Sequence, residues 1–144
     1  MERKIITPPT LAAPRGFSHG ILVTGGRTLF LAGQDASGPD GRIVARGDLL
    51  GQFEQVLRNL STVVDAAGGT LQDVVKLNIF VLDRTAYRAN SKRLGELFRA
   101  RFAAHYPAMA LFEVSGFYQD DALIEMEGIA VIEGGGPIRV RDRA

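Results

Sequence analysis

Residues 49–67 carry apolar side chains at the spacing of one helix face, and this stretch constrains the fold more than any other part of the chain. The stripe consists of Leu49, Leu50, Phe53, Val56, Leu57, Leu60, Val63, Val64 and Ala67. Asp48 can cap the first turn, and Gly68-Gly69 can adopt the positive φ that commonly ends a helix. We therefore predict an amphipathic helix that buries one face against another layer.

The segment that follows, Asp73 to Leu82, alternates in the manner of a strand but is apolar on both sides. Val75, Leu77, Ile79 and Val81 share one predicted face, and Val74, Lys76, Asn78 and Phe80 share the other. Helices can cover only one side of a sheet. We expect the second face to pack against another subunit, so the chain is predicted to be an oligomer.

The remaining elements complete a mixed α+β pattern. They are an N-terminal arm or loop over residues 1–20 with at most one short strand near Ile5; a hairpin of Ile21–Thr24 and Thr28–Ala32 around Gly25-Gly26-Arg27; a possible short strand at Arg42–Ala45; a second helix from about Thr85 to Phe102; strands Ala108–Val114 and Ala122–Val131; and a loosely ordered tail over residues 133–144. This order predicts a mixed β-sheet with two helices packed on one face.

Composition excludes several classes of function. The 144 residues fit one domain over 1–144, and 17 basic against 16 acidic residues leave a net charge of +1, so nucleic acid is not expected as a partner. Without cysteine there is no disulfide framework or thiolate nucleophile. No apolar run is long enough to cross a membrane, and the Pro-rich start does not resemble a secretory signal. We expect a soluble, cytoplasmic protein.

Several short motifs follow one another along nearly the whole chain. They are Gly16-Phe17-Ser18-His19; Leu31-Ala32-Gly33-Gln34; Gln52 with Asn59-Leu60; Ala67-Gly68-Gly69 followed by Asp73-Val74-Val75-Lys76; Asn90; Pro107-Ala108; Glu113-Val114; and Ile124 to Ala130. No single motif is specific, but their order and spacing are. In these motifs the chain resembles the Rid/YjgF family, which was once known under translation inhibitor and ribonuclease names.

This resemblance implies a chorismate-mutase-like α+β fold that assembles as a homotrimer, with a cleft at each of three subunit interfaces. In the best-known branch these clefts hydrolyse reactive enamine and imine intermediates, such as 2-aminoacrylate, to a 2-keto acid and ammonia. No cofactor is expected for this reaction. The expected partners are a small-molecule ligand and two further copies of the chain.

The sequence departs from that branch at two positions. A Pro-Ala-Arg segment holds the substrate carboxylate in the branch, whereas this chain has Pro107-Ala108-Met109. A thioether cannot replace the forked, permanently charged guanidinium. The branch's tyrosine in the first loop is Phe17 here, which lacks the hydroxyl. We therefore expect a ligand that is more apolar, larger or uncharged at the end beside Met109.

Glu125 is the candidate catalytic residue, because it matches the cleft glutamate that is thought to orient or activate the hydrolytic water. The alternative is a rim carboxylate paired with Lys or Arg across an interface. Gly33 and Gln34 follow a buried strand, where glycine permits close approach of a ligand, or simply forms a bulge. Asn90 can donate to a ligand or be solvated.

Ser18 and His19 lie in the loop that lines the family's cleft. Ser18 has no evident His-Asp relay that would make it a nucleophile, whereas His19 is a candidate for a contact with the ligand. The second histidine, His105, is distant in sequence, and neither has the spacing of metal ligands, so no metal is expected. Two functions remain open: an enzyme that hydrolyses an imine, enamine or similarly activated metabolite, and a non-catalytic, regulatory ligand-binding trimer.

Overall fold

The computed structural model describes residues 1–134, and the predicted helix over residues 49–67 is present in it as α1, Leu49–Ala66. The Asp48 side chain accepts a hydrogen bond from the Gly51 backbone N–H at 3.1 Å, and Gly68, at φ +86°, follows the last turn. Phe53, Val56, Leu57, Leu60 and Val64 are buried, as the periodicity predicts. Both the span and the caps of this helix are confirmed.

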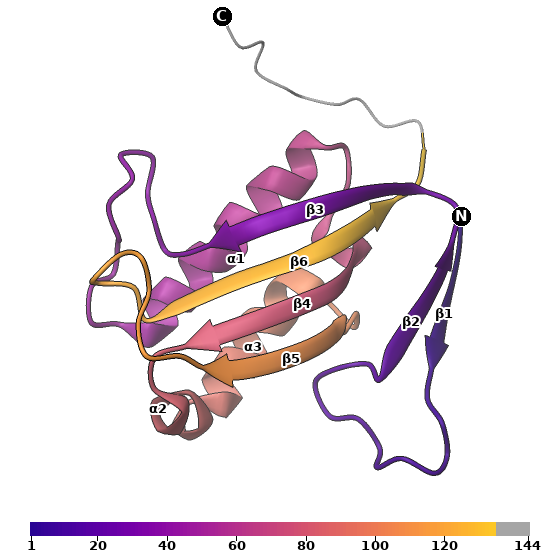
Figure 1. Cartoon of the computed structure of the whole chain (residues 1–144), viewed down its shortest axis with the longest axis horizontal. Coiled ribbons are helices and arrows are strands. Elements are labelled where there is room, and N and C mark those ends of the chain that lie inside the picture. The colour runs from indigo at the N-terminus through magenta and orange to yellow at the C-terminus, as the bar shows by residue number, and fades with distance from the viewer. Residues whose placement is uncertain (135–144) are drawn as a thin grey trace, which may run out of the picture.

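Four strands form the main sheet, in the order β3-β6-β4-β5. They are β3 (Arg27–Gln34), β6 (Ile124–Ile132), β4 (Val74–Val81) and β5 (Ala108–Glu113), and only the β4–β5 pair is parallel. A second, two-stranded sheet pairs β1 (Glu2–Ile6) with β2 (Gly20–Thr24). Figure 1 shows the helices behind the main sheet and its other face open, with the β1–β2 ribbon to one side. The predicted α+β class, with a mixed sheet and helices on one face, is confirmed.

The predicted hairpin between Ile21–Thr24 and Thr28–Ala32 is wrong. Gly25 and Gly26 do turn the chain, at φ +78° and +83°, but the two strands separate after the turn. Strand β2 pairs along its length with β1, and β3 pairs with β6. A local turn signal identifies the bend but not the distant segments that compete for the strand edges.

The predicted second helix is two helices, α2 (Arg84–Ala89) and α3 (Ser91–Phe102), divided at Asn90. The Asn90 side-chain amide donates to the Ala86 carbonyl at 2.8 Å, and its backbone leaves the helical region at ψ 14°. Asparagine commonly competes with the backbone in this way. A single 3-10 turn, η1 (Leu71–Asp73), precedes β4, and the possible strand over 42–45 is reduced to one bridge between Ser37 and Ile43.

The core lies between the helices and one face of the main sheet. Leu77, Ile79 and Val81 of β4 point into it, as predicted, but Val74, expected on the opposite face, is also fully buried. The β4–β6 register shifts between Val74 and Lys76, so the alternation restarts at that irregularity. From α3, Leu94, Phe98 and Phe102 close the core from the helix side.

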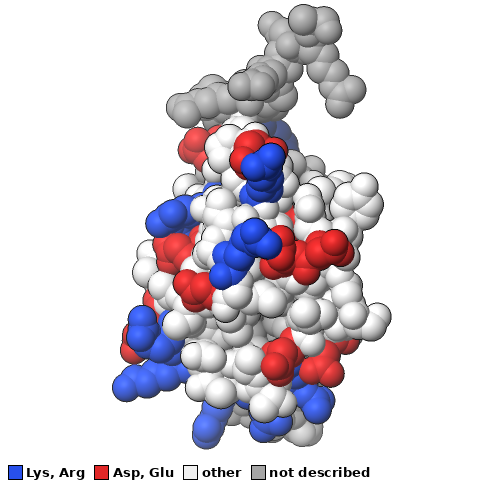
Figure 2. Space-filling view, turned by 90° about the vertical axis from the view of Figure 1, so that its left-hand side faces the viewer, with Lys and Arg blue, Asp and Glu red and all other residues white. Residues whose placement is uncertain are grey.

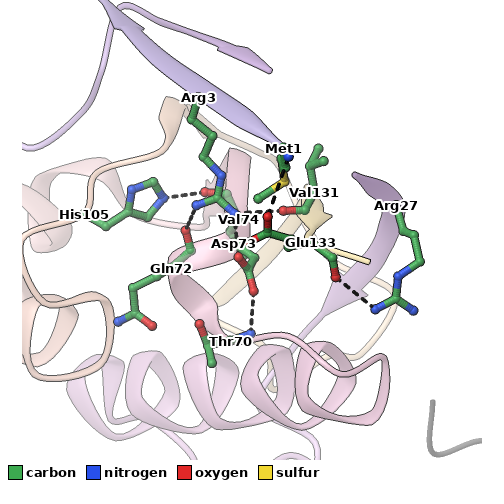
Figure 3. A network of polar contacts seen from close by, with 10 residues as sticks. All are labelled: Met1, Arg3, Arg27, Thr70, Gln72, Asp73, Val74, His105, Val131 and Glu133. Atoms are coloured by element: carbon green, nitrogen blue, oxygen red, sulfur yellow. Dashed lines mark hydrogen bonds and ion pairs between the residues drawn. The ribbon is translucent and has the colours of Figure 1, made fainter. Parts of the chain in front are cut away.

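The N-terminal strand is anchored to one end of the main sheet by a polar network (Figure 3). Arg3 donates to the carbonyls of Gln72 at 2.8 Å and Val131 at 2.9 Å, and forms an ion pair with Asp73. The arm predicted over residues 1–20 is thus a strand and a loop that return to the sheet. The tail predicted over 133–144 lies outside the described residues beyond position 134.

No helix within residues 1–134 is both long and apolar enough to cross a membrane.

Candidate functional site

Glu125 lies on the open face of the main sheet, against Gly33. Strand β6 places Glu125 opposite Phe80 of β4, and the neighbouring residue Met126 points to the core side, where it is fully buried. A Cβ built at Gly33 would lie 3.0 Å from both Cδ and Oε1 of Glu125. A side chain at position 33 would therefore force the Glu125 carboxyl group to shift by a few tenths of an ångström. Two of the candidate site residues predicted from the sequence, Gly33 and Glu125, thus lie against each other.

The environment of Glu125 disfavours its charged form. Burial, followed by the negative charges of Asp35 and Glu127, raises the pKa of the Glu125 carboxyl above its usual value of 4.5. Within the described residues no cation forms an ion pair with it, whereas Glu127 accepts a hydrogen bond from Asn78 at 3.4 Å. Within the described residues the Glu125 carboxyl group is therefore unpaired, and the alternative pairing with Lys or Arg would have to come from a second subunit.

The raised pKa predicts a pH-dependent stability effect of Glu125→Gln. The folded state holds the proton of Glu125 more tightly than the unfolded state, so ionisation of Glu125 destabilises the fold as pH rises through and above 4.5. Glu125→Gln should therefore raise the melting temperature at pH 7.5, and the gain should disappear below pH 4.5. Thermal unfolding at several pH values measures this. A variant that is less stable at pH 7.5 would contradict the assigned environment.

Met109 lies on the other face of the sheet. In the parallel β4–β5 pair, Met109 lies beside Leu77, which is a core residue, so its side chain points toward the helices. There it lines a cavity of about 310 Å³ under the N-terminal loop and α3. Met109 and Glu125 of one chain are thus separated by the sheet itself.

The loop residues Phe17, Ser18 and His19 are held beside the start of β5. The Ser18 hydroxyl donates to the Tyr106 carbonyl at 2.6 Å, and its backbone N–H donates to the Pro107 carbonyl at 3.0 Å. Phe17 and His19 make an edge-to-face contact at 5.2 Å, and His19 Nε2 lies 2.7 Å from the Ala12 carbonyl. Ser18 is buried, and its hydroxyl serves to position the loop.

Gln34 and Asn90, the last two predicted binding residues, do not line the cavity beside Met109. Gln34 lines a groove against α1, and the Asn90 amide is engaged with Ala86 at the helix break. The cavity beside Met109 is lined instead by the next residue, Ser91, and by Arg15, Arg99 and Tyr106, none of which the sequence analysis singled out. The one sequence feature that could have indicated this cavity was the isolated Gly95 inside the apolar pattern of the predicted second helix. No His, Cys, Asp or Glu cluster suited to a metal occurs in residues 1–134.

This α+β domain, with a carboxyl group on an open sheet face and a cavity under the first loop, has many relatives. The profile described as Endoribonuclease L-PSP matches residues 8–132. A RutC family protein of Pyrococcus abyssi is 31% identical over 92% of this chain and 100% of its own length. A 2-iminobutanoate/2-iminopropanoate deaminase of Dermatophagoides farinae is 30% identical over 91% of this chain and 98% of its own.

Solved structures agree with these relatives. A protein of unknown function from the Rid family of Yersinia pestis, YyfB, superposes with a TM-score of 0.79 at 35% identity, covering 92% of this chain and all of that one. RidA from an Antarctic Psychrobacter superposes with a TM-score of 0.64 at 32% identity, covering 89% of this chain and 98% of that one. The chain belongs to the Rid/YjgF family, whose profile carries the name Endoribonuclease L-PSP.

The one face drawn in Figure 2 has no concentration of positive charge. Figure 2 shows basic and acidic side chains interspersed on the end of the molecule where β3, β4 and β5 finish. A surface that binds phosphates in series usually concentrates positive charge. The whole chain carries a net charge of only +1.

Proposed function

We propose that this protein hydrolyses an imine, an enamine or a similarly activated small metabolite in a cleft between subunits. The observation that carries the proposal is the Glu125 carboxyl group: it is unpaired among the described residues, placed against Gly33, and raised in pKa by burial and by Asp35 and Glu127. A carboxyl group with a pKa nearer neutrality both accepts and returns protons efficiently at the pH of a cell.

The reaction needs only water and proton transfers. Glu125 takes a proton from water while the oxygen attacks the C=N carbon, and the proton passes to nitrogen. Collapse of the resulting carbinolamine breaks the C–N bond, releasing ammonia and leaving the carbonyl product. An enamine first takes a proton on carbon to become the imine. Membership in a family that includes a named imine deaminase supports this chemistry.

A cleft that uses both Glu125 and the cavity beside Met109 requires two chains. The two positions lie on opposite faces of one sheet, so they can face a common ligand only if one subunit supplies each. The open face also carries exposed aromatic side chains: Phe30 is 75% and Phe112 48% exposed, and Phe112 stacks on Phe80 at 5.7 Å. Apolar surface of this kind is usually covered in an assembly.

We therefore predict a homotrimer. Light scattering should give three times the chain mass of 15.6 kDa. Phe30→Asp should shift the protein toward monomer, because it places a charge in the covered face, whereas Tyr118→Asp, at a fully exposed position outside the strands, should leave the mass unchanged. A wild-type monomer at micromolar concentration would overturn both the trimer and the shared cleft.

The experiment that tests the function is release of ammonia from imino acids generated in the assay by an amino-acid oxidase, with and without the protein. Acceleration by wild type that Glu125→Gln abolishes supports the enzyme. The alternative, a non-catalytic ligand-binding trimer, is favoured by one observation: the polar groups of Ser18 and Asn90 are already bonded to backbone carbonyls. Ligand binding without any acceleration would favour that alternative.

A further inference from the structure

The cavity beside Met109 is rich in cationic and hydroxyl groups. Its volume is about 310 Å³, within the range of small-molecule sites. Arg15, Arg99, Tyr87, Ser91 and Tyr106 contribute polar side chains to its wall, and no carboxylate does. This polar and cationic lining differs from the sequence-based expectation, in which Met109 indicated a ligand that is apolar or uncharged at the end beside it.

Neither arginine is engaged elsewhere in the described chain. Four other arginines form ion pairs with carboxylates, namely Arg3, Arg46, Arg58 and Arg101, whereas Arg15 and Arg99 form none within residues 1–134. Two uncompensated guanidinium groups that share one hollow create a positive potential in it, and an anion that enters would be attracted by both.

Specific local structure brings each arginine to the cavity. The Ser18 hydrogen bonds to the backbone of Tyr106 and Pro107 hold the loop against β5, and Gly16, at φ +75°, turns the chain just after Arg15. On α3, a Cβ at Gly95 would lie 3.2 Å from Nη1 of Arg99. The Arg99 guanidinium therefore folds back over Gly95, toward the start of α3, where Ser91 lines the cavity.

Aromatic rings form the apolar part of the same cavity. Phe53 contacts Tyr87 with ring centroids 6.4 Å apart, and Phe98 stacks on Tyr106 at 5.9 Å. Burial raises the pKa of Tyr87 to about 12, so its hydroxyl stays neutral and able to donate at physiological pH. Rings of this kind pack well against a planar or branched apolar group.

We infer that this cavity binds a small organic carboxylate with an aromatic or branched apolar body, whose acid group is held by Arg15 and Arg99. The inference rests on the proposed function, because it names the ligand class of the same inter-subunit cleft. The acid group lies between the loop and α3, and the apolar body lies against Phe53, Phe98 and Met109.

Calorimetric titration with benzoylformate, its uncharged methyl ester, pyruvate and inorganic phosphate tests the inference. The wild type should bind benzoylformate at least about 10-fold more tightly than the ester or pyruvate. Arg15→Met and Arg99→Met should each weaken benzoylformate binding about 10-fold, and the double variant about 100-fold, with ester binding unchanged. Arg93→Met, on the same helix but outside the cavity, is the matched control, and circular dichroism checks that each variant is folded.

Gly95→Leu keeps both positive charges but occupies the space over which the Arg99 side chain folds. It should therefore weaken the binding of benzoylformate as much as Arg99→Met does. Unchanged benzoylformate affinity in the folded double variant would overturn the inference, as would wild-type binding of phosphate that is tighter than that of benzoylformate. The outcome is separate from that for Glu125. If Glu125→Gln abolishes turnover while the arginine variants bind benzoylformate normally, the proposed hydrolysis is supported and the anion site is contradicted. If Glu125→Gln leaves turnover unchanged while the arginine variants lose benzoylformate binding, only the anion site is supported.

Discussion

Replacing Glu125 with glutamine is expected to lower the turnover of an imine substrate about 100- to 10,000-fold, the usual contribution of a positioned general acid or base. Glutamine has nearly the same shape, so it fits against Gly33, but it cannot accept the proton of water. Since the Glu125 side chain has no cation partner among the described residues, this substitution leaves no buried charge unpaired. The measurement is the first-order rate of ammonia release at saturating protein.

A second variant separates chemistry from folding. Gly33→Ala keeps the carboxyl group but places a methyl group 3.0 Å from its Cδ and Oε1 atoms, so Glu125 must move by a few tenths of an ångström. We expect an intermediate loss of turnover, because general catalysis depends on position as well as on pKa. Equal rates for wild type and a folded Glu125→Gln would leave Glu125 as a structural carboxylate and would falsify the proposed hydrolysis.

The features of the fold that depend on local sequence could be predicted. The span of α1, its Asp48 cap and the glycine after it all follow from neighbouring residues. Strand pairing could not be predicted, since Gly25-Gly26 specifies a turn whether the flanking strands pair with each other or with distant partners. The burial of Val74 was missed for a similar reason: the irregularity that redirects it depends on β6, which lies far along the chain.

In the candidate site, too, features that depend on local motifs could be predicted and features that depend on distant segments could not. Ordered motifs identified Glu125 and Gly33, which the structure brings into contact. Met109 was assigned to the site from its motif alone. The arginines that line the cavity beside it, Arg15 and Arg99, could not be predicted because they belong to no motif and come from separate segments of the chain. That Met109 and Glu125 occupy opposite faces became apparent only from the strand registers.

Among the glycines of residues 1–134, Gly128 is the one whose replacement by alanine is expected to have the largest effect on stability. Gly128 lies in β6 opposite Leu77, and a Cβ there would lie 2.2 Å from the backbone oxygen of Lys76 and 3.4 Å from the Cα of Leu77. A flexible side chain could rotate away, but these are main-chain atoms of the central strand β4. The steric clash can therefore be relieved only if β4 and β6 move apart, and this separation weakens the hydrogen bonds between the two strands.

Overpacking of a core typically costs about 1–3 kcal/mol, and a backbone clash in a central strand pair lies at or above the upper end of that range. We expect Gly128→Ala to lower the free energy of unfolding by about 3 kcal/mol or more, which corresponds to a fall in melting temperature of about 10 °C. Gly116→Ala is the matched control, since a Cβ there meets nothing within 4 Å and its stability should change by less than about 0.5 kcal/mol. Urea unfolding followed by circular dichroism measures both variants. If Gly128→Ala unfolds at the same urea concentration as Gly116→Ala, the close approach of β6 to β4 at this position is incorrect, and with it the strand register that places Glu125 on the open face.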